Sequence, residues 1–382
     1  MENTPLAGLK VVELARILAG PWVGQTLSDL GADVIKVESP EGDDTRRWGP
    51  PYFDVEGEPS AAYFHGCNRG KRSVTADFRD KKGQDLVREL VKQADVLIEN
   101  FKLGGLEKYG LDYKSLIKIN PGLIYCSITG FGHEGPYAER AGYDFMIQGM
   151  AGIMDLTGEP DREPQKIGVA FADIFTGLYS VIAIQSALIM RERTGKGQHI
   201  DMALFDCMTA VLANQGMNYL ATGKAPKRMG NTHPNIAPYQ TLPVSDGYFI
   251  IACGNDGQFA KLVKLLGLHG VAEDENYASN AARVKNRDSL TQMLEEQTRL
   301  WTRDALLVEL EKLKIPAGPI NSVADVFSDP QFIARNMQIN PQNVPGLRTP
   351  IKFSDAELKL GQRSPLLGEH DAEIAELLQK NS

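Results

Sequence analysis

Residues 9–38 carry two short apolar runs on either side of a helical segment, and this order limits the possible folds. The run LKVVEL is typical of a buried strand, ARILAGP of a turn, and WVGQTLSDLG of a helix that ends at Gly31. ADVIKVE is typical of a second strand. Two strands joined by one helix form a parallel crossover, so we expect the chain to begin as an α/β sheet.

The same pattern continues along the first half of the chain. Residues 81–101 read as a helix followed by a strand, and residues 120–132 read as another strand. The stretch 222–238 is rich in Gly, Pro and Asn, as expected of a linker or an ordered loop. Residues 238–325 follow with one strand-like run and two helix-like runs. The chain is therefore expected to form an open α/β sheet with helices on its faces, followed by a second region.

Several classes of protein are excluded by what the sequence lacks. The turn ARILAGP has no G-x-G-x-x-G, which argues against a dinucleotide enzyme, and no P-loop occurs. The net charge of −8 argues against a nucleic-acid partner. Scattered cysteines, histidines without zinc spacing, and no targeting segment predict a cytoplasmic protein without a metal site. The apolar run 174–190 is too polar for a membrane span, and a buried helix is the expectation.

Asp173 stands out as one acid among the small and apolar residues of GVAFADIFTG. One interpretation is a helix N-cap, since Asp is favoured there. The other is a nucleophile, because helix amides and the helix dipole favour an ionised carboxylate that can attack an activated acyl group. The two interpretations are compatible.

Two further features allow either a structural or a functional interpretation. Tyr143 and Asp144, in AGYDFMIQGMAG, either open a helix or shape a site. Three basic clusters, in GDDTRRWGPP, NRGKRS and ENFK, are either solvated surface or the place where an anionic ligand binds. Their occurrence in one α/β region favours a phosphate-bearing ligand.

The chain resembles the class III CoA-transferase family, which includes formyl-CoA transferase, carnitine CoA-transferase and alpha-methylacyl-CoA racemase. The resemblance runs from about residue 6 to residue 337. It rests on LAGLKVVEL, LGADVIKVESPEGDDTR, NRGKRSV, ADVLIENF, INPGLIYCSITGFGHEGP, AGYD, FADIFTGLY, RTGKGQHIDMALFD and IPAGPINS.

The resemblance implies roles for particular residues. Asp173 becomes the covalent nucleophile, which carries first an acyl group and then CoA as an aspartyl-CoA thioester. The loop at 252–258, with Gly254 and Gly257, matches a glycine-rich loop that covers the site in formyl-CoA transferase. The residues implied in binding CoA are Ile17, Leu18, Arg46, Lys71, Arg72, Asn100 and Phe101.

The resemblance favours a transferase over a racemase. Racemases of the family have His where this chain has Tyr143, and Tyr is a poor base at neutral pH. The pattern is closest to transferases that use succinyl-CoA with glutarate, hydroxymethylglutarate or oxalate. Arg16 is then a candidate to bind the distal carboxylate of a dicarboxylic acid, or else a structural ion pair or CoA contact. A 2-methylacyl-CoA racemase and a non-catalytic CoA-binding protein are the alternatives.

The implied fold is a large Rossmann-like α/β domain made by residues 1–222 and 326–382. A smaller α/β domain, residues 223–325, is inserted, and two chains interlock as a homodimer. The partners implied are an acyl-CoA and a free carboxylic acid, with CoA as substrate and no tightly bound cofactor. No nucleic acid or membrane is expected as a partner.

Overall fold

A computed structural model describes residues 3–380, and the chain folds into two compact units. The first unit contains the chain up to Ile153, then Lys166–Ala221, and the chain from Pro330 onward. The second contains Met154–Gln165 and Thr222–Asp329. The sequence pattern predicts that 154–165 belongs to the large domain. In the structure the Arg228 side chain donates hydrogen bonds to the carbonyl oxygens of Asp155, Glu159 and Arg162, which draws this segment into the second unit.

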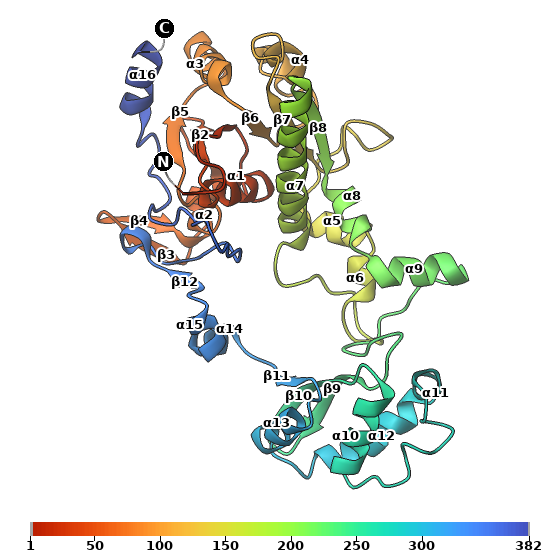
Figure 1. Ribbon diagram of the computed structural model, residues 1–382. Helices are drawn as coiled ribbons and strands as arrows, with labels where there is room; N and C mark the ends of the chain where they lie inside the picture. Colours follow the sequence, from red (N-terminus) through yellow and green to blue (C-terminus); the bar gives the residue numbers. More distant parts are fainter. Residues whose placement is uncertain (1–2, 381–382) are drawn as a thin grey trace. The chain divides into compact units, whose positions relative to one another are not determined.

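Within the described residues, the first unit is built on a six-stranded parallel sheet (Figure 1). The strand order is β5-β2-β1-β6-β7-β8, which is the doubly wound order of Rossmann folds. The strand order reverses between β1 and β6, and ligands of such sheets bind beyond the carboxyl ends of the strands at this point. The strands are β1 (Lys10–Glu13), β2 (Asp33–Glu38), β5 (Arg72–Thr75), β6 (Val96–Glu99), β7 (Ile124–Thr129) and β8 (Gln198–Ala203).

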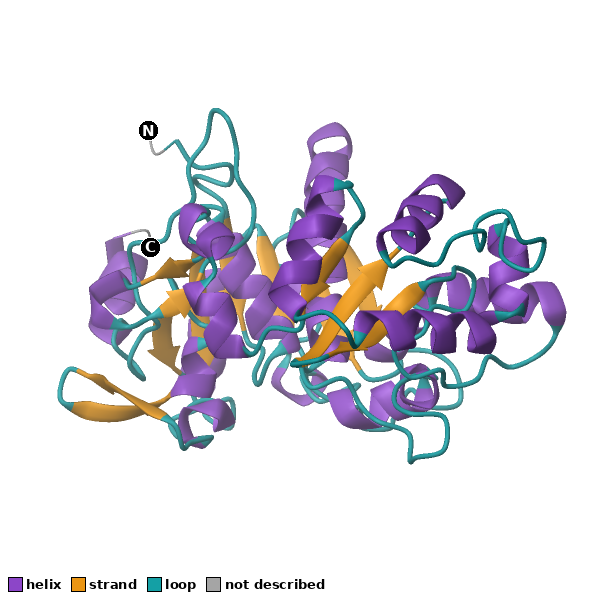
Figure 2. Ribbon diagram, turned by 90° about the horizontal axis from the view of Figure 1, so that it is seen from below, coloured by secondary structure: helices purple, strands orange, loops and turns teal. Residues whose placement is uncertain are grey.

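Helices cover both faces of this sheet (Figure 2). Successive residues of a strand point to opposite faces, so Val11 joins one hydrophobic cluster and Val12 the other. The first cluster lies under α1 (Ala19–Asp29), α7 (Phe171–Thr194) and α8 (Leu204–Ala210). The second lies under α3 (Lys81–Gln93), α4 (Tyr113–Leu116) and α16 (Asp371–Lys380). These layers confirm the expected α/β fold.

Helix α7 is the longest helix of the described chain and begins with the segment that contains Asp173. By length and composition alone it could cross a membrane. In the structure it packs against α1, α8, β7 and β8 with one face, while apolar side chains such as Ile182 and Ile189 are exposed, so the expected buried helix is buried on one side only. A Cβ added at Gly177 would lie 3.1 Å from the carbonyl oxygen of Ala19 and 3.1 Å from Trp22. Glycine at this position therefore lets the second turn of α7 and the first turn of α1 approach closely.

The remaining elements of the first unit are short or peripheral. The loop after β2 carries η1 (Asp44–Arg47), and a hairpin follows it. The others are β3 (Tyr52–Val55), β4 (Glu58–Ala61), α2 (Ala62–His65), η2 (Glu107–Tyr109), α5 (Asp144–Met150), α9 (Ala213–Thr222), α15 (Pro330–Ala334), β12 (Gln338–Ile339), η3 (Pro341–Asn343) and β13 (Gly346–Leu347). Only the first residue of α6 (Ile153–Leu156) belongs to this unit, and the rest belongs to the second.

The second unit has its own core. A three-stranded antiparallel sheet in the order β11-β10-β9 packs against helices through a separate hydrophobic cluster that includes Phe249, Phe259 and Leu306. Its elements are β9 (Tyr239–Val244), β10 (Gly247–Ala252), α10 (Asp256–Leu265), α11 (Asn280–Lys285), α12 (Arg287–Thr298), α13 (Arg303–Lys312), β11 (Ala317–Pro319) and α14 (Val323–Ser328).

The C-terminal segment returns to the edge of the large sheet. The amide of His370 donates to the carbonyl of Ser73, and the Asp371 carboxylate accepts hydrogen bonds from the amide and hydroxyl of Thr75. The first unit is therefore built from both ends of the chain.

Candidate active site

The loops that follow β1 and β6 meet at the point where the strand order reverses. The amide of Arg16 donates to the Asn100 side-chain oxygen at 2.9 Å, and the Asn100 side chain donates to the carbonyl of Arg16 at 2.7 Å. This reciprocal pair joins the two loops. It fixes the residues that follow, Ile17 and Phe101, at the mouth of the crevice.

A cavity of about 400 Å³ opens beside this junction. Its volume is within the usual range for small-molecule sites. It is lined by residues from the loops after β1 and β6, from the end of β7, from the segment 138–143 and from the start of α7. The predicted site residues that line it are Arg16, Ile17, Leu18, Asn100, Phe101, Tyr143 and Asp173.

Asp173 occupies the third position of α7, in its first turn, and its side chain is half-buried. The N-cap position belongs to Ala170, so the N-cap interpretation of Asp173 is wrong by three residues. Within residues 3–380, no hydrogen bond contributes to the ionisation of its carboxyl group. Burial, and then the charge of Asp144, raise the pKa of Asp173 to about 7.

The raised pKa corrects the expectation that the helix terminus keeps this carboxylate ionised. Loss of water and then repulsion by Asp144 both favour the protonated form of this carboxyl group. The result is a carboxyl group that ionises near neutral pH and whose negative charge is not stabilised by a hydrogen bond from residues 3–380. Such a group suits nucleophilic attack on an activated acyl carbon.

Asp144 ties α5 to the first turn of α7. Its carboxylate accepts hydrogen bonds from the amide of Ala172 and from the side-chain amide of Gln148, both at 2.8 Å. Gln148 is buried, and its oxygen accepts from the amide of Ile167 at 2.9 Å. Sequence reasoning missed Gln148, because no local pattern shows that it reaches the segment before α7.

Tyr143 is 68% exposed and lies at the start of α5, beside Gly142. A Cβ on Gly142 would lie 2.3 Å from the Cα of Gly130, which follows β7. Two glycines in contact therefore bring the Tyr143 segment against the end of the sheet.

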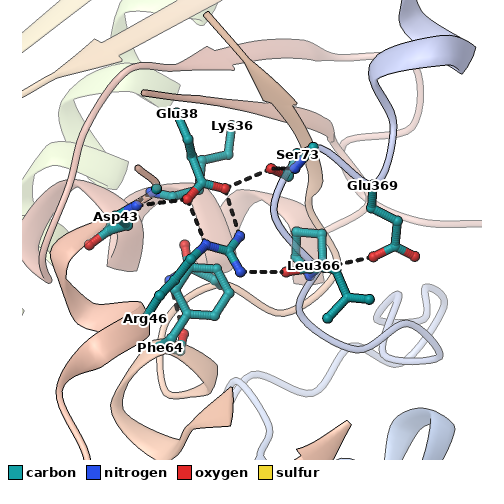
Figure 3. Close-up of polar contacts among 12 residues, drawn as sticks. Lys36, Glu38, Asp43, Arg46, Phe64, Ser73, Leu366 and Glu369 are labelled. Atoms are coloured by element: carbon teal, nitrogen blue, oxygen red, sulfur yellow. Dashed lines mark hydrogen bonds and ion pairs between the residues drawn. The ribbon is translucent and has the colours of Figure 1, made fainter. Parts of the chain in front are cut away.

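The basic residues predicted to bind CoA form hydrogen bonds and ion pairs with other residues of the protein. The Arg46 guanidinium donates to both oxygens of Glu38 and lies over the Phe64 ring, 3.8 Å from its centre (Figure 3). Lys71 is 2% exposed and donates to Glu13, Asn68 and the carbonyl of Pro21.

Arg72 pairs with the carboxylates of Asp33 and Glu373. None of Arg46, Lys71 and Arg72 lines the cavity beside Asp173. Their role in binding CoA stays a prediction, and the structure places them in ion pairs that stabilise the fold around the cavity.

The two glycines of the loop predicted to cover the site lie in another part of the chain. Gly254 and Gly257 lie in the second unit, where the amide of Gly254 donates to the side chain of Gln258 at 2.8 Å.

All four cysteines are buried and unpaired. Among residues 3–380, no three His, Cys, Asp or Glu side chains are arranged to hold a metal ion.

Comparison with known proteins adds to this geometry. The sequence profile of CoA-transferase family III matches residues 6–371. The chain belongs to CoA-transferase family III. It is 57% identical, over 97% of its length and 94% of the relative's, to a succinate–glutarate CoA-transferase of Agrobacterium fabrum (strain C58). It is 39% identical to the human succinyl-CoA:glutarate CoA-transferase, over 97% of this chain and 85% of that protein.

A solved structure agrees with the assignment. The crystal structure of a CAIB/BAIF family protein from Brucella suis matches this transferase with a TM-score of 0.90 and 79% identity, and the match covers 99% of this chain and all of that one. The protein is thus a CoA-transferase, and CoA thioesters are substrates of such enzymes.

Two further residues, Arg140 and Tyr63, could not be singled out from the sequence of this CoA-transferase. Arg140 lines the cavity, lies over the rings of Phe131 and Tyr137, and forms no ion pair with residues 3–380. Burial, and then the charge of Asp173, raise the pKa of Tyr63 to about 12, so the phenol lies within electrostatic range of that carboxylate. Both come from segments whose sequence shows only ordinary loop or helix residues.

Proposed function

We propose that this enzyme moves CoA from an acyl-CoA, with succinyl-CoA as the expected donor, to a dicarboxylic acid through Asp173. The observation that carries the proposal is a half-buried carboxyl group at the reversal point of a Rossmann-like sheet, to which no group of residues 3–380 is seen to donate a hydrogen bond. Relatives named for succinyl-CoA, glutarate and oxalate support the choice of substrates.

The reaction begins when the ionised Asp173 attacks the carbonyl carbon of the donor thioester. A C–O bond forms and the C–S bond breaks, which gives a mixed anhydride and a CoA thiolate. The thiolate then attacks the aspartyl carbonyl and releases succinate, leaving CoA bound to Asp173 as a thioester. The acceptor carboxylate repeats the two steps in the opposite direction. Electron pairs move between oxygen and sulfur, and no net proton transfer is needed.

The residues that line the cavity position the substrate and exclude water from it. The walls that Ile17, Leu18 and Phe101 form around the cavity keep water from a thioester or anhydride on Asp173. We propose that these residues and Asn100 hold the pantetheine end of CoA, as the family resemblance implies.

Arg16 and Arg140 are the two guanidinium groups that line the cavity. Arg16 is half-exposed and pairs with Asp44 at 2.9 Å. We propose that Arg16 exchanges this exposed pair for the distal carboxylate of the acceptor. Exposed ion pairs contribute little to stability, so the exchange costs little.

We propose a homodimer in the cytoplasm as the working form. Three helices of the first unit expose large apolar side chains that a second copy could cover. These residues are Phe145, Met146 and Met150 of α5, Leu178, Tyr179, Ile182, Ile189 and Met190 of α7, and Met217, Tyr219 and Leu220 of α9. Light scattering of the purified protein tests the dimer directly.

The test of the proposed function is Asp173→Asn. We expect it to lower CoA transfer from succinyl-CoA to glutarate by roughly a thousand-fold or more, while calorimetry finds free CoA still bound. Asp304→Asn is the matched control, since Asp304 lies in the first turn of α13 and is exposed. Near-normal CoA transfer by Asp173→Asn would rule out Asp173 as the nucleophile.

A further inference from the structure

Ile17 has a backbone conformation that is unusual for its side chain. Its φ of 71° lies in the left-handed region, which β-branched residues rarely adopt. Ile17 lies between β1 and α1 and lines the Asp173 cavity. A residue stays in such a conformation only where its surroundings hold it there, and such positions gather at functional sites.

The group that holds Ile17 is the carboxylate of Asp43. The amide of Ile17 donates to both oxygens of Asp43, at 3.2 and 3.3 Å. The amide and hydroxyl of Thr45 donate to the same carboxylate at 3.0 and 2.8 Å. On the other side, the thiol of Cys67 lies 3.5 Å from the carbonyl oxygen of Ile17. Asp43 is 1% exposed, so water does not compete for these bonds.

Asp43 is itself fixed to the sheet. Its carboxylate pairs with Lys36 of β2 at 3.0 Å, and neither side chain is exposed. Burial opposes the charge of Lys36, but the carboxylates of Glu13, Asp43 and Glu38 outweigh it and raise the lysine's pKa. The amide of Asp43 donates to Glu38 at 2.9 Å, and Glu38 also accepts from Arg46 and Ser73 (Figure 3).

We propose that Asp43 is a positioning residue, which holds Ile17 in its left-handed conformation so that Ile17 and Leu18 form the wall of the cavity beside Asp173. This rests on the proposed function, because the cavity is taken as the acyl-CoA site. Asp43 does not line that cavity and acts through the backbone of Ile17. The charge of Asp43 matters because both of its oxygens accept from donors and one pairs with Lys36, whereas a neutral amide has one oxygen and would turn an NH₂ group toward the remaining donors.

A double-mutant cycle tests the proposal. Asp43→Asn removes the carboxylate, and Ile17→Gly removes the conformational cost, since glycine adopts positive φ freely. We expect Asp43→Asn alone to lower kcat/KM by about ten-fold, mainly through a higher KM for acyl-CoA. In the Ile17→Gly background we expect the same change to cost less than about three-fold.

Asp29→Asn is the matched control. Asp29 is also buried and pairs with a buried guanidinium, that of Arg69, at 2.6 Å, and it does not contact Ile17. We expect it to weaken folding without raising the KM for acyl-CoA. Equal losses from Asp43→Asn in both backgrounds, or the same KM change in the control, would overturn the proposal.

Urea unfolding of the wild type, Asp43→Asn, Ile17→Gly and the double variant gives a result that does not depend on the proposed function. Absence of transfer by the wild type counts against the proposed function. A smaller effect of Asp43→Asn on unfolding when residue 17 is Gly still supports the role of Asp43, and additive effects contradict it. If Asp43→Asn does not fold, recovery of folding by the double variant supports the proposal, and failure of both contradicts it.

Discussion

The carboxylate of Asp144 accepts a hydrogen bond at 2.8 Å from the amide of Ala172, the residue directly before Asp173. This bond anchors the first turn of α7 and also brings a second negative charge near Asp173. The same neighbour therefore helps to set the position of Asp173 and, after burial, its pKa.

Asp144→Asn separates these two effects. An amide oxygen can still accept from Ala172, but the repulsion that helps raise the pKa of Asp173 to about 7 is lost. We expect the acidic limb of the profile of kcat/KM against pH, which reports groups of the free enzyme, to move to lower pH. Rates measured from pH 5 to pH 9 check this, with Asp304→Asn as control. An unmoved limb would mean that Asp144 acts through geometry alone.

Asp173→Asn should stabilise the folded protein at high pH. The folded protein holds the Asp173 proton up to a pKa of about 7, above the ordinary value of 3.8, so stability is lost as pH rises between these values. Removing the carboxylate removes that loss, by at least about 1 kcal/mol at pH 8, since one pKa unit corresponds to roughly 1.4 kcal/mol. Urea unfolding at pH 4 and pH 8 should show a gain at pH 8 alone. A gain of equal size at both pH values would have another cause.

Gly142→Ala tests the contact that places Tyr143. The new methyl group would lie 2.3 Å from the Cα of Gly130, so one backbone segment must move. We expect a loss of about 1–3 kcal/mol in the free energy of unfolding and a lower kcat/KM. Gly361→Ala is the control, because nothing lies within 4 Å of its added Cβ. Equal stability of the two variants would show that the two glycines are not in close contact.

The strands that frame the site could be predicted from sequence because each is a short, continuous apolar run. The runs LKVVEL and ADVIKVE became β1 and β2 of a parallel sheet, as expected. The start of α7 was missed because Phe171 and Ala172 carry no start signal, whereas Asp173 resembles a cap.

The buried ion pairs could not be predicted in the same way. Lys71 binds Glu13, 58 residues away, and only the paired strands of the finished sheet bring such partners together. Local sequence made these cations look like free surface charge or ligand contacts. The raised pKa of Asp173 has a similar origin, because burial and Asp144 depend on the packing of α5 against α7.

Arg16→Gln tests recognition of the acceptor. Because the Arg16 guanidinium is proposed to bind the distal carboxylate, we expect the KM for glutarate to rise by about ten-fold or more, with little change in the KM for butyrate. Initial rates at varied acid concentration check this. Arg47→Gln is the control, since Arg47 lies 4.0 Å from the same Asp44 and does not line the cavity. Equal effects on both acids would assign Arg16 to CoA or to the fold.

The most direct measurement is peptide mass spectrometry of the enzyme after incubation with succinyl-CoA and hydroxylamine. The proposed mechanism predicts a hydroxamate on Asp173, formed from the anhydride or the thioester, and its absence from a sample without succinyl-CoA. Free CoA esters read in parallel should show glutaryl-CoA when glutarate is present. Rapid CoA transfer to glutarate with Asp173 unmodified, or with the hydroxamate on another carboxylate, would contradict the central role of this residue.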